Sequence, residues 1–404
     1  MRKMEFSTIE IQKNLFYVGV NDRHTGLFEN MWPLENGISY NSYLLKGEKN
    51  ILIDPVHASC FELYLSKIRS VIGQDGTIDY LIINHMEPDH SSSISLLLNV
   101  FPKMKLVGNS KTAEFIKGFY KLDISENFIE VGEGETHKFG NFALTFYKTP
   151  MAHWPESMVT YYKESKTLFS QDLYGGFGTI DGGIFDDEID YTAREFERAR
   201  YFTNVVGKFA SQILRATKKL ENLEIKTICP VHGIVWRSNP EKIVKFYDDL
   251  ANCRTKNGVV IAYGTMYGNT EKMADYLANT LSKNGVRDVR LFDVSKTHVS
   301  YIFTHIWLNK GLFLGSASYN NALFPVMQEL ISLISTHKMK NHILGIFGTY
   351  AWSGGGVKNL LEFAKNNTEF DFIDMPVEAH CSPSYDDLQH CKTLAEEMAK
   401  RVLA

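Results

Sequence analysis

The sequence predicts an α/β protein built from two domains, and two observations support this. A chain of 404 residues is longer than one ordinary hydrophobic core accommodates. The pattern of apolar segments also changes along the chain. Many short strands with interspersed helices come first, and a regular alternation of strands and helices follows. We therefore expect two domains, residues 1–253 and residues 254–404.

Short apolar segments bounded by polar residues predict the strands of the first domain. The expected strands are 42–45, 50–54, 128–131, 142–147 and 158–162. Segments of helical character lie between and after them, at 60–72, 93–101, 110–120 and from 191 to about 223. The first domain is thus a mixture of strands and helices.

In the second domain, continuous apolar strands alternate with helices. The last predicted helix of the first domain, 240–252, is followed by the polar stretch 254–258, which is the predicted linker. The expected strands are 258–263, 289–292, 311–315 and 342–347, and the expected helices are 270–283 and 322–336. Apolar strands that alternate with helices indicate a doubly wound parallel sheet with helices on both faces.

Composition is typical of a soluble globular protein and argues against two classes of partner. The apolar fraction is 44%, the charged fraction 22% and the formal net charge −4. No general basic face for nucleic acid or an anionic membrane is expected. No apolar run approaches the ~20 residues of a membrane span, and residues 1–7 lack an apolar signal core. We therefore expect a cytoplasmic location.

The five cysteines indicate a reducing compartment. Cys60, Cys229, Cys253, Cys381 and Cys391 are odd in number, and no C-x-x-C pair occurs. The absence of paired thiolates also excludes a rubredoxin or zinc-ribbon module on this chain. Any iron–sulfur electron donor is therefore expected to be a separate protein.

One loop, residues 85–90 (His-Met-Glu-Pro-Asp-His), concentrates side chains that bind metals. It follows an apolar strand, and its proline holds the turn so that alternate side chains can converge. Two imidazoles and two carboxylates exceed the needs of one metal. The spacing favours two, with His85 and Glu87 on one and Asp89 and His90 on the other. The alternative is a helix N-terminus capped by Asp89 or a following serine, with the other side chains solvated.

Three further ligand candidates lie where predicted strands end. His153, Asp172 and His232 each come where an apolar segment gives way to Gly, Pro or polar residues. A single histidine in such a place is usually a capped or solvated loop residue. Four separate loops with the right residue types favour one site, to which the fold must bring distant segments.

Three loops of the second domain predict a phosphate-bearing ligand. The first, 264–270 (Gly-Thr-Met-Tyr-Gly-Asn-Thr), directly precedes a helix, whose N–H groups and dipole can hold a phosphate; alone, it is also an ordinary turn with an N-cap. All three loops are expected at the carboxyl edge of the sheet. The candidate ligand-binding residues are Thr265, Met266, Tyr267, Gly268, Asn269, Thr270, Ser316, Ala317, Ser318, Tyr319, Asn320, Gly348, Thr349, Tyr350, Ala351, Trp352, Ser353 and Gly354.

The ligand candidates of the first domain resemble the metallo-β-lactamase superfamily, an αββα sandwich that gathers H-x-H-x-D-H, a later His, an Asp and a last His. Glu87 stands where most members have the second histidine. A carboxylate is a harder donor than imidazole, which favours iron or manganese over zinc, and this replacement marks the flavodiiron branch. The resemblance implies two irons per chain, one held by His85, Glu87 and His153, the other by Asp89, His90 and His232, with Asp172 bridging.

The second domain resembles a flavodoxin, which implies FMN with its phosphate in the first loop and its ring between the other two. Tyr350 and Trp352 could pack on the ring or simply cover apolar surface. Gly264 stands where many relatives have an acidic residue. No G-x-G-x-x-G occurs, so a nicotinamide site is not indicated. Domain order, Glu87 and the loop 352–355 together resemble flavodiiron proteins over essentially the whole chain, in their minimal two-domain form.

The resemblance implies an oxidoreductase that reduces O2 to water for oxygen detoxification, or NO to N2O at the same site. We expect O2 reduction to dominate, with selectivity set near the site, at His24, Phe28 or Trp154. Two alternatives are a two-zinc hydrolase with an appended flavodoxin and an electron carrier with a degenerate first domain. Glu87 and the fused flavin domain argue against the former, and the complete ligand set against the latter.

The resemblance also implies partners. Electrons are expected from a separate donor such as rubredoxin, a flavoprotein reductase or a reduced deazaflavin. The family arrangement implies a head-to-tail homodimer, possibly a tetramer, in which the FMN of one subunit serves the di-iron site of the other.

Overall fold

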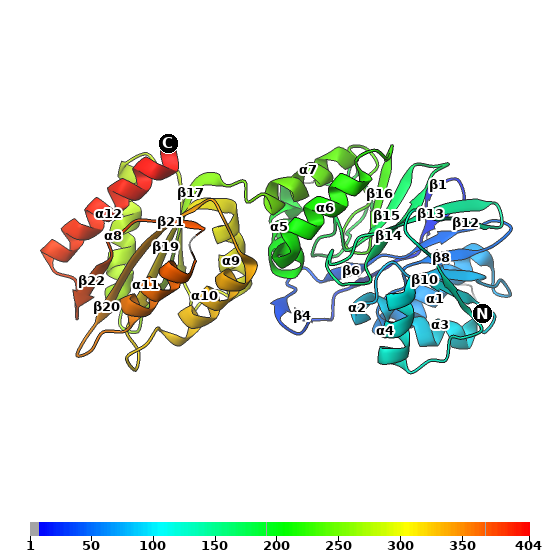
Figure 1. Cartoon of the computed structure of the whole chain (residues 1–404), viewed down its shortest axis with the longest axis horizontal. Coiled ribbons are helices and arrows are strands. Elements are labelled where there is room, and N and C mark those ends of the chain that lie inside the picture. Colours follow the sequence, from blue (N-terminus) through cyan, green and yellow to red (C-terminus); the bar gives the residue numbers. More distant parts are fainter. Residues whose placement is uncertain (1–7, 191, 368) are drawn as a thin grey trace. The chain divides into compact units, whose positions relative to one another are not determined.

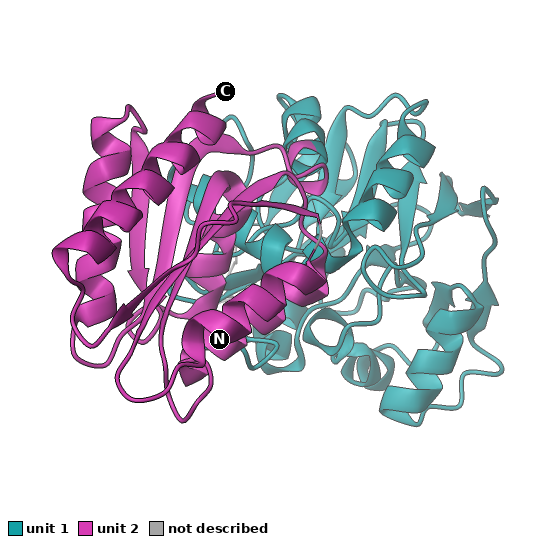
Figure 2. Ribbon diagram, turned by 60° about the vertical axis from the view of Figure 1, so that its left-hand side comes forward, with its two compact units in different colours: residues 1–248 teal, residues 249–404 magenta. Residues whose placement is uncertain are grey.

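In a computed structural model the chain divides into two compact units, residues 1–248 and 249–404 (Figure 2). The structure describes residues 8–190, 192–367 and 369–404, so the predicted absence of a signal core in residues 1–7 lies outside it. The division falls within the helix α7 (Pro240–Ala251). The domain boundary expected at residues 253 and 254 stays a prediction.

Two sheets form the centre of unit 1. The larger sheet has seven strands in the order β1 (Ile9–Gln12), β2 (Leu15–Tyr17), β7 (Tyr43–Leu45), β8 (Ile51–Ile53), β9 (Tyr80–Ile82), β10 (Lys105–Gly108) and β11 (Phe128–Glu130). The strands from β1 to β8 pair antiparallel, and those from β8 to β11 pair parallel. Because β9 and β10 run the same way as β8, their carboxyl ends lie at one edge of the sheet.

The second sheet of unit 1 has five strands, antiparallel except for its last pair. Its order is β12 (Thr136–Phe139), β13 (Phe142–Lys148), β14 (Met158–Tyr162), β15 (Thr167–Gln171) and β16 (Thr227–Pro230). Two small hairpin-like pairs accompany the sheets, β3 (Val20–Asp22) with β6 (Ile38–Tyr40) and β4 (Leu27–Phe28) with β5 (Trp32–Pro33).

Helices cover the outer faces of the two sheets (Figure 1). Beside the larger sheet lie α1 (Phe61–Ile72), α3 (Ile94–Val100) and α4 (Ser110–Tyr120), with the single turn α2 (Pro88–Ser91) near its edge. Beside the smaller sheet lie α5 (Glu195–Tyr201), α6 (Ala210–Leu220) and α7. This layering is the αββα sandwich expected from the sequence.

The helical region predicted from residue 191 to about 223 contains two α-helices with other helical turns before and between them. Residue 191 lies outside the described residues, a 3₁₀ turn covers Thr192–Arg194, and α5 ends at Tyr201. A π-helical turn (Phe202–Val206) and a 3₁₀ turn (Gly207–Phe209) then separate α5 from α6. The described part of the region is therefore largely helical, as predicted, but it is not one regular α-helix. Such π turns shift the side chains that follow onto a different face, and they are frequent at functional sites.

Unit 2 is a parallel sheet with the order expected of a flavodoxin-like fold. Its strands run β18 (Asp288–Asp293), β17 (Lys256–Gly264), β19 (Asn309–Ala317), β20 (His342–Tyr350) and β21 (Phe370–Phe372). The strand β22 (Val377–His380) pairs with the carboxyl end of β20, and β21 pairs with its beginning. Residues 256–258, predicted as part of the linker, instead begin β17. These residues are extended because β17 pairs with a neighbouring strand on each side.

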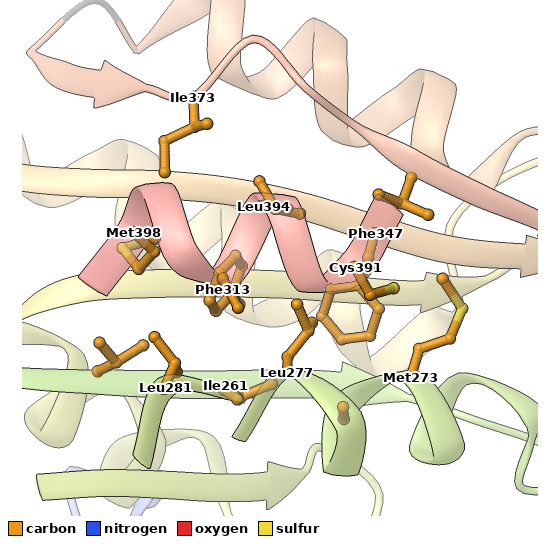
Figure 3. Close-up of a cluster of buried hydrophobic side chains, with 14 of the residues drawn as sticks. Ile261, Met273, Leu277, Leu281, Phe313, Phe347, Ile373, Cys391, Leu394 and Met398 are labelled. Atoms are coloured by element: carbon orange, nitrogen blue, oxygen red, sulfur yellow. The ribbon is translucent and has the colours of Figure 1, made fainter. Parts of the chain in front are cut away.

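Helices cover both faces of this sheet. On one face lie α8 (Asn269–Lys283) and α12 (Tyr385–Leu403), which contact each other; α9 (Val299–Leu308), α10 (Pro325–His337) and α11 (Gly356–Asn366) lie on the other. Figure 3 shows the core beneath α8 and α12, where Leu277, Phe313, Leu394 and Met398 are fully buried. Among the described helices, none is both long and apolar enough to cross a membrane.

The core beneath α12 gives a stability prediction. Replacing the fully buried Leu394 by Ala removes packed methyl groups, and we expect unit 2 to lose about 2–5 kcal/mol of unfolding free energy. The matched control is Leu403→Ala in the same helix, because Leu403 is 45% exposed. Urea unfolding of the full chain, followed by pulse proteolysis of its C-terminal half, measures both. An equal loss in the two variants would contradict this account of the core.

Candidate di-metal and flavin sites

The loop 85–90 lies just beyond the carboxyl end of β9 and runs into the single helical turn α2. Pro88 is the first residue of that turn, where its missing N–H costs nothing. Glu87 occupies the N-cap position, but its side chain makes no capping hydrogen bond. The helix-terminus alternative is therefore correct for the backbone only. The polar side chains are not capping groups but point into the protein.

All seven ligand candidates come together in two adjacent groups. The donor atoms within each group lie within 4.8 Å of one another. One group consists of His85, Glu87, His153 and Asp172, and the other of Asp89, His90 and His232. All seven side chains are buried except that of Asp89, which is partly exposed. Their loops follow β9, β13, β15 and β16, so the two sheets of unit 1 bring distant segments to one edge.

Asp172 lies between the two groups. Its Oδ2 is 3.1 Å from His85 Nε2 and 3.3 Å from His153 Nε2, and its Oδ1 is 3.4 Å from His232 Nε2. On either side, His153 Nε2 is 3.0 Å from a Glu87 oxygen, and His232 Nε2 is 3.1 Å from Asp89 Oδ2. Oδ2 also lies 3.6 Å from His90 Nε2 of the second group, so this carboxylate faces ligands of both groups, as a bridging ligand would.

Most of the donor atoms that converge in this cluster lack hydrogen-bond partners in the protein. His85 Nε2, His232 Nε2, Asp172 Oδ2 and both oxygens of Asp89 are buried and make no hydrogen bond, and neither does either ring nitrogen of His90. Leaving so many buried polar atoms unsatisfied costs about 1–3 kcal/mol each. The residues therefore fit a pair of metal ions, because cations satisfy all these atoms at once.

The electrostatics of the cluster favour bound cations. Burial disfavours the charged form of His153, but Glu87 and Asp172 outweigh it and raise its pKa to about 10. The pKa of His90 rises to about 9 because Asp89 and Asp172 likewise outweigh burial. Burial opposes ionisation of Asp172, yet the neighbouring imidazoles of His153, His85 and His90 hold its pKa well below the usual range. Concentrated negative charge thus attracts positive charge to this site.

Two of the histidines form hydrogen bonds through Nδ1, the ring nitrogen that faces away from the cluster, and each contacts a different kind of group. His85 Nδ1 is 2.6 Å from Glu156 Oε1, which also accepts a hydrogen bond from the Met86 amide. His232 Nδ1 is 2.7 Å from the carbonyl oxygen of Ser39. Both contacts require the proton on Nδ1, so that Nε2 presents its lone pair to the cluster. Burial opposes ionisation of Glu156, but His85 and the Met86 amide hold its pKa below the usual range.

Asp172 is positioned by its neighbours in the sequence and by Tyr201. Gln171, the last residue of β15, has a φ of 50°, and the register with β16 shifts there. This left-handed residue turns the chain so that Asp172 faces the cluster. The Tyr201 hydroxyl donates to Asp172 Oδ1 at 2.7 Å. Because Tyr201 is the last residue of α5, the interrupted helix places this hydroxyl.

Aromatic side chains surround the ligands. The Phe28 ring lies 5.6 Å from that of His232, and the Trp154 ring lies 5.3 Å from that of His85. The Phe119 ring stacks on Trp154. His24, in contrast, is exposed. Of the three residues considered for selectivity, Phe28 and Trp154 therefore pack directly on ligand histidines, and an effect of any of them on selectivity stays a prediction.

In unit 2 a cavity of about 500 Å³ opens at the carboxyl edge of the sheet. This volume is within the ~300–1,000 Å³ typical of small-molecule sites. It lies at the N-terminus of α8, whose first backbone N–H groups and dipole favour a phosphate. The predicted residues that line it are Thr265, Met266, Tyr267, Asn269, Ala317, Ser318, Tyr319, Asn320, Thr349, Tyr350, Ala351, Trp352 and Ser353.

The five other predicted flavin residues support the cavity without lining it. Thr270 is fully buried, and its hydroxyl is 2.9 Å from that of Thr349, which ties the first loop to the third. The buried Ser316 hydroxyl accepts a hydrogen bond from the Phe324 amide. The remaining three are the glycines Gly268, Gly348 and Gly354. Gly268 has a φ of 81° directly before α8, a conformation in which glycine is the least strained residue.

Several residues of both sites carried no signal in the sequence. Glu156 and Tyr201 approach the cluster through side chains whose direction only the fold determines, and Ser39 contributes a carbonyl group that any residue has. Asn321 and Cys381 also line the flavin cavity. Asn321 directly follows the predicted loop 315–320, so extending that loop by one residue would have included it. Cys381 follows β22, a strand that the sequence did not predict.

Comparison with known protein families agrees with both halves of the chain. Residues 38–233 match the family model described as ODP family beta lactamase, and residues 261–393 match the model described as flavodoxin. The predicted fold class is thereby confirmed, a metallo-β-lactamase-like domain followed by a flavodoxin-like domain.

Relatives extend over nearly the whole chain. The anaerobic nitric oxide reductase flavorubredoxin of Escherichia coli is 31% identical over 98% of this chain and 82% of that protein. The rubredoxin oxygen:oxidoreductase of the anaerobe Desulfovibrio gigas has a TM-score of 0.93 and 30% identity, covering 98% and 99% of the two chains. The flavodiiron protein of Giardia intestinalis has a TM-score of 0.93 and 25% identity, covering 98% and 97%. Sequence, fold and the two sites agree, and the chain belongs to the flavodiiron protein family.

Proposed function

We propose that this protein reduces O2 to two molecules of water and so removes oxygen. It is an oxidoreductase of the flavodiiron family, with a non-haem di-iron pair and FMN as cofactors. The chemistry of O2 decides the number of electrons, because complete reduction takes four. Two ferrous ions and a reduced FMN together supply four when bound.

The observation that carries the proposal is the donor set of the buried cluster. Three of its seven side chains are carboxylates, Glu87, Asp89 and Asp172, and their oxygens converge with four imidazoles. Oxygen-rich ligation favours iron over zinc. A two-zinc hydrolase is not favoured, because Glu87 replaces an imidazole ligand and a second unit carries a flavin cavity. A degenerate first domain is equally disfavoured, since all the donors are present.

The protein side chains have separable tasks in this proposal. Asp172, oriented by the Tyr201 hydroxyl, would be a ligand of both metal ions. Glu156 and the Ser39 carbonyl fix the tautomers of His85 and His232. The rings of Phe28 and Trp154 pack against the ligand rings of His232 and His85. A buried site suits small apolar gases better than a large hydrated substrate.

Reduction of NO to N2O is the second candidate. It needs two electrons for each pair of NO molecules, and the same ligands serve it. The relative from Escherichia coli, a nitric oxide reductase, favours this activity, whereas the relative from Desulfovibrio gigas, an oxygen reductase, favours the first. The donor set is common to both, so selectivity depends on groups around it.

The electron donor is proposed to be a separate protein or cofactor. No C-x-x-C pair and no G-x-G-x-x-G motif occurs in the sequence, which argues against an internal rubredoxin module and a nicotinamide site. A rubredoxin, a flavoprotein reductase or a reduced deazaflavin would serve. A cytoplasmic location, expected from the cysteines, stays a prediction.

Assembly is proposed to be a head-to-tail dimer, and exposed apolar side chains at both sites support it. Around the flavin cavity Tyr267 is 89% and Trp352 91% exposed. In unit 1, Leu27, which adjoins Phe28, and Phe119, which stacks on Trp154, are also exposed. A second copy of the chain would cover both rims at once and bring each flavin to the partner's metals.

The first prediction of this subsection concerns the metals. The isolated protein should contain about two iron ions and one FMN per chain. Glu87→His should shift metal occupancy towards zinc and abolish reductase activity, because imidazole is a softer donor than carboxylate. Metal analysis and turnover measurements test this. The control is Glu130→His, an exposed position on β11 that should change neither. Two zinc ions per chain in the wild type, without redox activity, would refute the proposal.

The second prediction compares the two gases. The fully reduced protein, mixed with O2 or NO in a stopped-flow instrument, should be reoxidised faster by O2. Faster oxidation by NO would reverse the assignment. NADH alone should not reduce the flavin at a useful rate, because no nicotinamide site is present in the sequence, and rapid reduction would refute the need for a separate donor.

The third prediction concerns assembly. One subunit carries His85→Ala and His232→Ala and so lacks iron but keeps FMN. The other carries Thr265→Glu and Asn269→Asp, which set negative charge in the cavity against the FMN phosphate. Each homodimer should be inactive. A heterodimer purified through two different tags should regain one working site, since intact FMN of one subunit then serves intact iron of the other.

The heterodimer must be shown to contain FMN and iron before its activity is judged. Background O2 reduction in such a cofactor-loaded heterodimer would reject the head-to-tail arrangement, because transfer within one chain predicts no working site at all.

A further inference from the structure

The two metal positions differ in the groups that contact the Nδ1 atoms of their histidines. His85, in the first group, contacts a carboxylate, Glu156, through its Nδ1. His232, in the second group, contacts the neutral Ser39 carbonyl. The Nδ1 atom of His90, also in the second group, makes no hydrogen bond. Asp172 is common to both groups. Among the hydrogen bonds of the described residues, a carboxylate outside the ligand set therefore bonds to a histidine of the first group, His85, and to neither histidine of the second.

Burial and several hydrogen bonds fix Glu156 in position for this contact. Its side chain is 1% exposed, and one oxygen accepts from both His85 Nδ1 and the Met86 amide. Its own carbonyl group accepts a hydrogen bond of 2.6 Å from the Asn109 side chain. Asn109 is the N-cap of α4, with its side-chain oxygen bonded to the first turn. Glu156 thus joins the loop of His85, its own loop after β13 and the start of α4.

A buried carboxylate acts on the metal through the imidazole. A hydrogen bond from Nδ1–H to an anion makes Nε2 more basic and more electron-donating than a bond to a neutral carbonyl does. The charge is buried, so solvent screens it weakly. Stronger donation and nearby negative charge stabilise Fe(III) relative to Fe(II). The effect must be larger at the nearer metal.

We propose that Glu156 is a positioning residue that makes the two irons unequal, so that the first electron given to the diferric pair is held at the position of Asp89, His90 and His232. In that step one electron converts one Fe(III) to Fe(II), and no bond is made or broken. The second electron reduces the position of His85, Glu87 and His153 at a lower potential. The inference rests on the proposed ligand set and adds an order of reduction to it.

The test is a reductive titration of the iron-loaded, FMN-containing protein with dithionite, followed by electron paramagnetic resonance and by Mössbauer spectroscopy of ⁵⁷Fe. Glu156→Gln keeps the shape and an acceptor oxygen but removes the charge. The second midpoint potential should rise more than the first, so the two potentials approach each other and less half-reduced pair accumulates. Iron affinity, measured by competition with a chelator, should fall about 10–100-fold.

Two control variants separate charge from mere structure. Asn109→Ser removes the hydrogen bond to the Glu156 carbonyl group while retaining a capping side chain, so the separation of the two potentials should stay as in the wild type. Glu156→Asp keeps the charge on a shorter side chain and should preserve most of the separation.

An unchanged separation in Glu156→Gln, or the same change in Asn109→Ser, would overturn the proposal. If Glu156→Gln binds too little iron for titration, Glu156→Asp decides, because loss of the separation with the charge retained would also overturn it. Failure of the di-iron assignment itself is distinguishable, since the wild type would then not bind two irons.

Discussion

The structure of unit 1 is organised around buried donor atoms that the protein itself does not satisfy. His85, Asp89, His90, Asp172 and His232 bring nitrogen and oxygen atoms together without hydrogen bonds to most of them. Buried polar groups normally have partners, because each missing hydrogen bond costs free energy of folding. The stability of this region and its reactivity are therefore linked. The cations that satisfy the cluster are also the groups that do the chemistry.

The surrounding fold supplies what such a cluster needs. Strand ends of two different sheets bring the ligands together, and outer contacts then fix their orientation. Glu156 and the Ser39 carbonyl select the histidine tautomers, while Tyr201 orients the carboxylate between the two groups. These contacts are short and buried, so their geometry is rigid. A rigid donor set needs little rearrangement when the metals change oxidation state.

The flavin cavity of unit 2 is constructed differently from the metal cluster of unit 1. Its cavity is formed by loops after parallel strands, next to the N-terminus of α8, so backbone N–H groups are available for a phosphate. The buried hydroxyls of Thr270 and Thr349 join two of the loops from behind. Large exposed aromatic residues, Tyr267 and Trp352, lie at its rim. The cavity holds a ligand chiefly through loop shape, not through charged side chains.

The sequence determined the residue types of the site, because metal chemistry restricts donors to a few side chains, and Glu87 in place of histidine was visible without any coordinates. It also determined the longer apolar strands, such as β13, β17 and β20, because strand periodicity is local, but it did not indicate β22. The tertiary structure alone decided the contacts behind the ligands. Glu156 and Tyr201 are unremarkable in the sequence, and the break after α5, the positive φ of Gln171 and the strand start at Lys256 follow from packing and pairing. A side chain's direction depends on residues distant in the chain, which no local pattern contains.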